Sequence, residues 1–133
     1  MNSKELFVRD TTVIKQSDNL YTAEVSENWS IGNTANGGYS MTIAARAMSE
    51  ILEHKDPLSI SAHYLNRVDF GSTEFRVTHL SSSKSLSTAR VELIQDNKIK
   101  IIFIGTFTDF SFKNDMNIYE RDVPSFPDYE SCE

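Results

Sequence analysis

The spacing of hydrophobic residues changes along the chain from a period of two to a period of 3.6 and back again. Residues 20–26 alternate, with Tyr21, Ala23 and Val25 on one side, which predicts a half-buried β-strand. A less regular pattern over residues 6–15 predicts an earlier strand. A loop is expected to follow residue 26 and to continue to the start of a helix.

The period of 3.6 begins at Tyr39 and predicts one long helix. Its apolar positions recur at helical spacing: Met41, Ala44, Ala45, Met48, Ile51 and Leu52. Ile43 and Ala47 widen this stripe, so we expect the helix to be buried along most of its length. Pro57 is expected to end the helix, and no second helix is indicated.

Four strand-like segments follow the helix, at residues 59–65, 73–80, 85–95 and 98–110. Gly71, a serine cluster between residues 81 and 87, and Asp96-Asn97 are expected to form the turns. This order predicts an α+β fold in which an antiparallel sheet of five or six strands wraps around one long buried helix. Residues 1–110 are expected to form this single domain, and residues 111–133 an acidic, proline-containing tail or linker.

Composition narrows the class of protein. The chain has 39% hydrophobic and 24% charged residues, as expected for one globular domain. Its 13 basic and 19 acidic residues give a net charge of −6, which argues against nucleic acid as a partner. No apolar run reaches the ~20 residues that span a bilayer, so no membrane association is expected. The single cysteine, Cys132, has no partner for an internal disulfide, which favours the cytoplasm.

The sequence contains no motif for a metal or a cofactor. The histidines lie at positions 54, 63 and 79, without the spacing of a metal site, so no metal is expected. The chain has no phosphate-binding loop and no dinucleotide fingerprint, so no cofactor is expected.

Three stretches of sequence resemble the acyl-CoA thioesterase II family and its thioesterase-like relatives, whose domains have the hotdog fold. The first stretch contains Trp29, Gly37-Gly38-Tyr39 and Ala44-Ala45-x-Ala47. The second contains His63-Tyr64-Leu65 followed by Gly71, and the third contains Leu80, Ser85-x-Ser87-x-x-Arg90-Val91 and Gln95. Together they cover about residues 10–110, and the resemblance implies a hotdog domain.

The resemblance also implies a function in fatty-acid metabolism. The domain is expected to bind fatty-acyl-CoA thioesters and to act as a hydrolase if water attacks the bound thioester. Family members carry two hotdog domains in one chain, and this chain resembles the N-terminal one. The hydrolytic acid, threonine and glutamine of the bacterial members lie in the other half, and their positions project here onto Gly38, Leu58 or Ser59, and Gly105 or Thr106. None of these is a general base, so a non-catalytic acyl-binding or structural half is the alternative.

The start of the long helix is the candidate catalytic site. The backbone N–H groups of Gly38 and Tyr39 are expected to form an oxyanion hole at the positive end of the helix dipole. Asn36 is the polar side chain at the helix entrance and is a candidate for positioning water. The alternative for Asn36 is a structural N-cap, with the two glycines as a tight turn.

Six further residues are candidate substrate contacts: Trp29, Gly37, His63, Tyr64, Arg90 and Gln95. Strand alternation places His63 and Tyr64 on opposite faces, so only one of them faces the helix. The alternatives are a solvated or packed histidine, an arginine on a solvated face, and a glutamine bonded to the backbone at a strand end. The exposed edges of a lone hotdog sheet predict a homodimer or pairing with a second hotdog domain.

Overall fold

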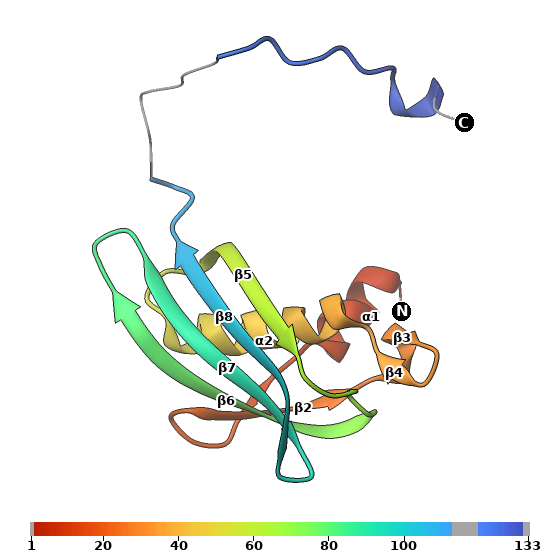
Figure 1. The fold of residues 1–133 in the computed structure, drawn as a ribbon, viewed down its shortest axis with the longest axis vertical. Helices are drawn as coiled ribbons and strands as arrows, with labels where there is room; N and C mark the ends of the chain where they lie inside the picture. Colours follow the sequence, from red (N-terminus) through yellow and green to blue (C-terminus); the bar gives the residue numbers. More distant parts are fainter. Residues whose placement is uncertain (1, 113–119, 132–133) are drawn as a thin grey trace.

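The computed structural model describes residues 2–112 and 120–131. Six strands form one antiparallel sheet in the order β1-β2-β6-β7-β8-β5. Their bounds are β1 Ile14–Lys15, β2 Leu20–Val25, β5 Asp56–Tyr64, β6 Gly71–Ser82, β7 Ser87–Gln95 and β8 Lys98–Thr108. Helix α2, Gly37–Ile51, lies across one face of this sheet, which curves around it (Figure 1). The α+β arrangement predicted from the sequence is therefore confirmed.

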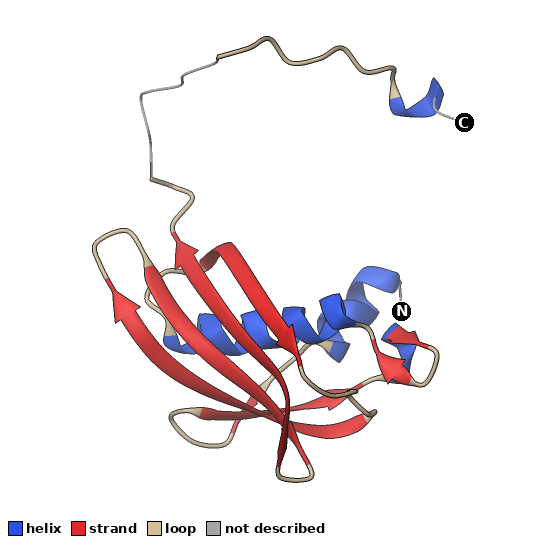
Figure 2. Ribbon diagram, in the orientation of Figure 1, coloured by secondary structure: helices blue, strands red, loops and turns tan. Residues whose placement is uncertain are grey.

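The core lies between α2 and the inner face of the sheet (Figure 2). Ile43, Ala44, Ala47 and Met48 are completely buried on the helix side. Gly105 on β8 allows the helix to come close, because a Cβ at this position would lie 2.5 Å from the Met48 Sδ. Small residues at such points let a helix pack directly on a sheet.

The end of α2 differs from the prediction. The helix ends at Ile51, and Leu52 is already extended, although its N–H still bonds to the Met48 carbonyl. Pro57 does not end the helix, because it lies within β5. The chain leaves the helix before it reaches Pro57, because tertiary contacts replace the helical hydrogen bonds. The N–H of His54, for example, donates to Ser87 Oγ at 3.3 Å.

The strand predicted over residues 6–15 is wrong for most of its length. Residues Ser3–Asp10 form a second helix, α1, and only Ile14–Lys15 form a strand. A capping box starts α1: Asn2 Oδ1 accepts the N–H of Glu5 at 2.9 Å, and Glu5 Oε2 accepts the N–H of Asn2 at 3.0 Å. Two local hydrogen bonds thus favour helix over the weak alternation, and the expectation of a single helix is also wrong.

The remaining elements follow the predicted order with shifted bounds. Strand β6 continues to Ser82, so it includes part of the serine cluster, and β7 begins at Ser87. Asp96 and Asn97 have φ values of 52° and 59°, as a tight hairpin turn requires. The 3-10 helix η1, Glu27–Trp29, and the short ribbon of β3, Ser30–Ile31, and β4, Thr34–Ala35, connect β2 to α2.

The tail is described from residue 120 to residue 131, and its residues are exposed, with a final 3-10 turn, η2, at Tyr129–Ser131. Its expected role as a linker stays a prediction, and Cys132 lies outside the described residues. Among the described residues, no helix is long and apolar enough to cross a membrane.

Candidate functional site

Asn36 caps the first turn of α2. Its Oδ1 accepts the N–H of Gly38 at 2.8 Å and the N–H of Tyr39 at 3.3 Å. These are the two donors expected to form the oxyanion hole, so a ligand oxygen reaches them only after the Asn36 side chain rotates away. The geometry corresponds to the N-cap alternative for Asn36.

Gly37 is the first residue of α2 and faces the ring of Tyr64. A Cβ on Gly37 would lie 2.9 Å from both Cε1 and Oη of Tyr64, so the ring occupies the space of the missing side chain. Among the described residues, none accepts a hydrogen bond from the Gly37 N–H. This amide and the Tyr64 hydroxyl are therefore neighbouring donors at the helix start.

Two hollows adjoin this first turn. The Trp29 hollow, about 320 Å³, is bordered by the three aromatic residues Phe7, Trp29 and Tyr39 together with Asn36 and Gly38. The Tyr64 hollow, about 400 Å³, is bordered by Thr34, Gly37, Tyr64, Asn66 and Arg67. Neither is lined by an Asp or a Glu from the described residues.

Aromatic contacts and one buried carboxylate build the wall of the Trp29 hollow. The Phe7 and Trp29 rings meet edge-on with centroids 4.8 Å apart, and the Trp29 and Tyr39 centroids lie 6.2 Å apart. Asp10 accepts hydrogen bonds from Trp29 and Asn28. Burial raises the pKa of Asp10, but the bonds from Asn28, Arg9 and Trp29 outweigh burial and hold the pKa below its ordinary value.

The other predicted contacts lie elsewhere. His63 is exposed on the sheet face that points away from α2, in register with Ile102. Arg90 lies on the same outer face, where its guanidinium pairs with Glu92 at 3.4 Å. Gln95 is nearly buried. Its side-chain oxygen accepts the N–H of Asp69, and its side-chain NH2 donates to the Asp69 carbonyl and to the Thr73 hydroxyl. These bonds correspond to the structural alternative for Gln95.

Comparison with known proteins identifies the family. Residues 25–109 match the family model described as the acyl-CoA thioesterase N-terminal domain, which is more than half of the chain. The chain belongs to this family. No curated protein matches it significantly in sequence.

Solved structures agree on the fold of this thioesterase-family domain. A tesB protein of Mycobacterium avium subspecies paratuberculosis is 21% identical with a TM-score of 0.79, over 97% of this chain and 50% of that one. A hot dog fold protein of Alicyclobacillus acidocaldarius is 13% identical with a TM-score of 0.81, over 94% and 47%. A Streptococcus mutans protein bound to acetyl CoA is 15% identical with a TM-score of 0.63, over 72% and 85%. The hotdog fold is therefore confirmed.

The chain spans about half the length of the thioesterase II structures that it matches. The positions onto which the family's hydrolytic residues project do not converge. Ser59 and Thr106 are paired across β5 and β8, and the Thr106 hydroxyl bonds to Thr88 at 3.0 Å. Gly38 lies at the start of α2, whereas Gly105, the alternative to Thr106, faces Met48 near the other end of the helix.

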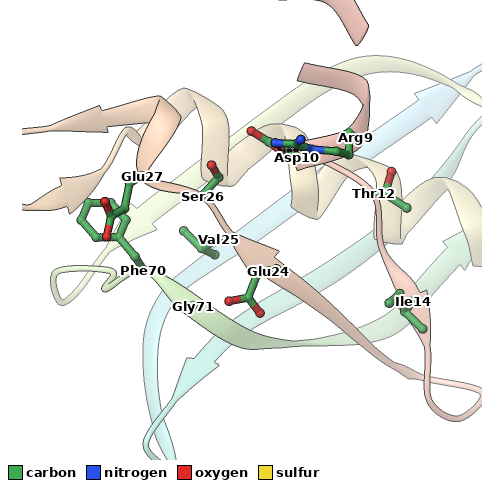
Figure 3. Close-up of a pocket in the computed structure, with 10 residues that line it drawn as sticks. All are labelled: Arg9, Asp10, Thr12, Ile14, Glu24, Val25, Ser26, Glu27, Phe70 and Gly71. Atoms are coloured by element: carbon green, nitrogen blue, oxygen red, sulfur yellow. Dashed lines mark hydrogen bonds and ion pairs between the residues drawn. The ribbon is translucent and has the colours of Figure 1, made fainter. Parts of the chain in front are cut away.

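Sequence reasoning missed a third and larger hollow of about 680 Å³ (Figure 3). Arg9 and Asp10 border it at the end of α1, and Glu24 and Glu27 border it from β2 and η1. Three carboxylates against one guanidinium make it a poor site for the phosphates of coenzyme A. The sequence did not predict this hollow because its border depends on α1. The one sequence signal for α1 was the Asn2-x-x-Glu5 capping box.

Proposed function

We propose that this domain binds acyl-CoA thioesters at the first turn of α2, with the thioester oxygen facing the helix N-terminus. The observation that carries the proposal is that two hollows flank this turn, the Tyr64 hollow at Gly37 and the Trp29 hollow at Gly38, and that the Gly37 N–H has no acceptor among the described residues. A carbonyl oxygen bound there gains from the helix dipole and from a fixed donor. The N–H groups of Gly38 and Tyr39 join the oxyanion hole when Asn36 rotates away.

A thioester has two arms, and the two hollows differ in a way that suits them. The Trp29 hollow has one wall of three aromatic rings, beside polar residues such as Asn28 and Thr42, and this wall suits the acyl group. The Tyr64 hollow is lined partly by apolar residues, and its border also carries Asn66 and the exposed Arg67, which pairs with Asp69 at 3.2 Å. These two polar side chains suit the pantetheine arm and the phosphates of coenzyme A. The family match supports acyl-CoA as the substrate class, and acyl-CoA has both the acyl arm and the polar arm.

A second candidate function is acyl binding without hydrolysis. It is favoured by the lining of both hollows, because no Asp or Glu from the described residues is placed to activate water. In that case this domain supplies the shape and stability of the acyl site, and no hydrolysis follows binding.

The partner is proposed to pair along β5. Within the described residues, this strand bonds only to β8, so its other edge is open over Asp56–Tyr64, whereas the opposite edge strand β1 has only two residues. A long open edge is expected to be covered by another chain or domain. Tyr64 lies on β5, so a second hotdog domain or a second copy paired there adjoins the Tyr64 hollow.

Calorimetric titration of the assembled protein with octanoyl-CoA and with free coenzyme A, together with a thiol-release assay, tests this function. We expect octanoyl-CoA to bind more tightly than free coenzyme A, and release of free thiol to be slow or absent. Equal affinity for the two ligands would contradict acyl binding. Ordinary enzymatic turnover would exclude the non-catalytic candidate and require a base that comes from the assembled partner.

A further inference from the structure

Trp29 and Tyr39 are held in place by one residue of α1. The Asp10 side chain is only 5% exposed. Its Oδ2 accepts the indole N–H of Trp29 at 3.1 Å and the side-chain amide of Asn28 at 2.9 Å. Its backbone carbonyl accepts the Tyr39 hydroxyl at 2.7 Å. The two larger rings of the Trp29 hollow therefore both bond to Asp10.

The other atoms of this network close it. The Arg9 guanidinium donates to Asp10 Oδ1 at 2.8 Å, so both carboxylate oxygens are occupied. The Tyr39 hydroxyl in turn accepts the N–H of Ser26 at 3.0 Å. A flip of the Trp29 ring would leave a buried carboxylate with one donor fewer, which is costly, so the indole has one favoured orientation.

We propose that Asp10 is a positioning residue that fixes the aromatic wall of the Trp29 hollow, and that this wall restricts the hollow to short or single-ring acyl groups. This inference rests on the proposed function. Asp10 and α1 precede residues 25–109, which match the family, so this control of acyl selectivity comes from a part of the chain outside the matched region.

Size and lining both support the choice of acyl group. A hollow of about 320 Å³ is near the lower end of ligand pockets, which range over ~300–1,000 Å³. Rings on one wall favour an aromatic or a short aliphatic group, since both fit against a flat apolar face. A long acyl chain packs wholly inside this hollow only if Trp29 or Phe7 moves, and the bond to Asp10 opposes this movement for Trp29.

The test compares Asp10→Asn with the matched control Asp18→Asn, whose exposed carboxylate pairs with Lys15 at 3.3 Å. The ligands are butanoyl-CoA, phenylacetyl-CoA and dodecanoyl-CoA, and calorimetry gives each Kd. We expect the wild-type protein to prefer the first two ligands over dodecanoyl-CoA. In Asp10→Asn this preference should fall about tenfold, the scale on which pocket shape discriminates between apolar groups, and Asp18→Asn should leave it unchanged.

A second measurement needs no ligand. Trp29 is the only tryptophan in the chain, so its fluorescence reports on this wall alone. Quenching by acrylamide should increase in Asp10→Asn and stay unchanged in Asp18→Asn. If Asp10→Asn does not fold, Asn28→Ala replaces it, because Asn28 is exposed and bonds to the same carboxylate oxygen. The same direction of change is expected, with a smaller size.

Three results would overturn the inference: a wild-type preference for dodecanoyl-CoA, an equal loss of affinity for all three ligands, or unchanged quenching in the folded variant. An equal loss would mean that Asp10 only supports the fold. The proposed function fails separately, when the wild-type protein binds none of the three acyl-CoA ligands more tightly than free coenzyme A.

Discussion

The Tyr64 ring lies where a side chain on Gly37 would be, with Oη and Cε1 both 2.9 Å from the position of the missing Cβ. This contact joins the edge strand β5 to the first turn of α2. It also explains why a glycine is needed at this position although its φ is not positive. The contact links the proposed partner edge to the proposed thioester site.

The first prediction concerns this contact. In Gly37→Ala the added methyl must displace the far end of the exposed Tyr64 ring, which costs up to ~1 kcal/mol of unfolding free energy. Tyr64→Ala should remove the penalty, so the double variant should be more stable than the sum of the single variants predicts. Chemical denaturation of the four proteins measures this coupling, and additive effects would contradict the contact.

Gly38→Ala separates substrate contact from turn geometry. A Cβ on Gly38 meets only Asn36 Oδ1, at 3.3 Å, so the fold and the oligomeric state should persist. The methyl should intrude on the bound thioester and weaken acyl-CoA binding about tenfold. Calorimetry and the melting temperature are measured on the same protein. Unchanged affinity in a folded Gly38→Ala protein would rule out contact between Gly38 and the ligand.

Asn36→Ala should act on stability more than on binding. The loss of the N-cap should cost ~1 kcal/mol of unfolding free energy. Acyl-CoA binding should persist, because the N–H groups of Gly38 and Tyr39 become free for the ligand oxygen. Asn19→Ala is the control, since Asn19 is an exposed asparagine outside α2. Thiol release that is rapid in the wild-type protein and abolished by Asn36→Ala would instead make Asn36 catalytic.

The pKa of Asp10 predicts how stability changes with pH. Burial raises this pKa, and the bonds from Asn28, Arg9 and Trp29 more than compensate, so the folded protein holds the pKa below its unfolded value. The stabilisation is therefore complete above the unfolded pKa of ~3.9 and is lost as the pH falls through the folded pKa. The difference in melting temperature between wild type and Asp10→Asn should be constant near neutral pH and should shrink in strong acid. A difference that grows in acid would contradict this assignment.

Periodicity predicted the elements whose side chains face a common core. Helix α2 and strands β5 to β8 follow it, because burying one face is what selects those residues. Helix α1 was missed because it is short and its start depends on two hydrogen bonds between Asn2 and Glu5. Such a capping box is visible in the sequence, but it competed with a weak alternation that favoured a strand.

The candidate site was predicted only in part, for a different physical reason. The start of α2 is a local feature, so Asn36, Gly37 and Gly38 were correctly placed at the beginning of the helix, while their role towards a ligand stays a prediction. The contacts that shape the hollows join distant segments: Tyr64 lies on β5, and Asp10 ends α1. Local patterns carry no information on such contacts, and two possible roles for Asn36 remained open until its bonds were known.

Assembly gives a further prediction. The open edge of β5 predicts that the protein is at least a dimer at micromolar concentration, or that it pairs with a separate hotdog domain. Sedimentation or light scattering measures the mass of the particle. A stable particle of 15.1 kDa, the mass of one chain, would contradict self-association.

Amide chemical shifts report directly on whether an acyl thioester binds at the start of α2. The assembled protein, labelled with ¹⁵N, is titrated with butanoyl-CoA and, separately, with free coenzyme A. We expect butanoyl-CoA to shift the backbone amides of Gly37, Gly38 and Tyr39 and the indole N–H of Trp29, and free coenzyme A to shift them less. Shifts confined to the outer face of the sheet, around His63 and Arg90, or no shifts at all, would contradict acyl-thioester binding at the start of α2.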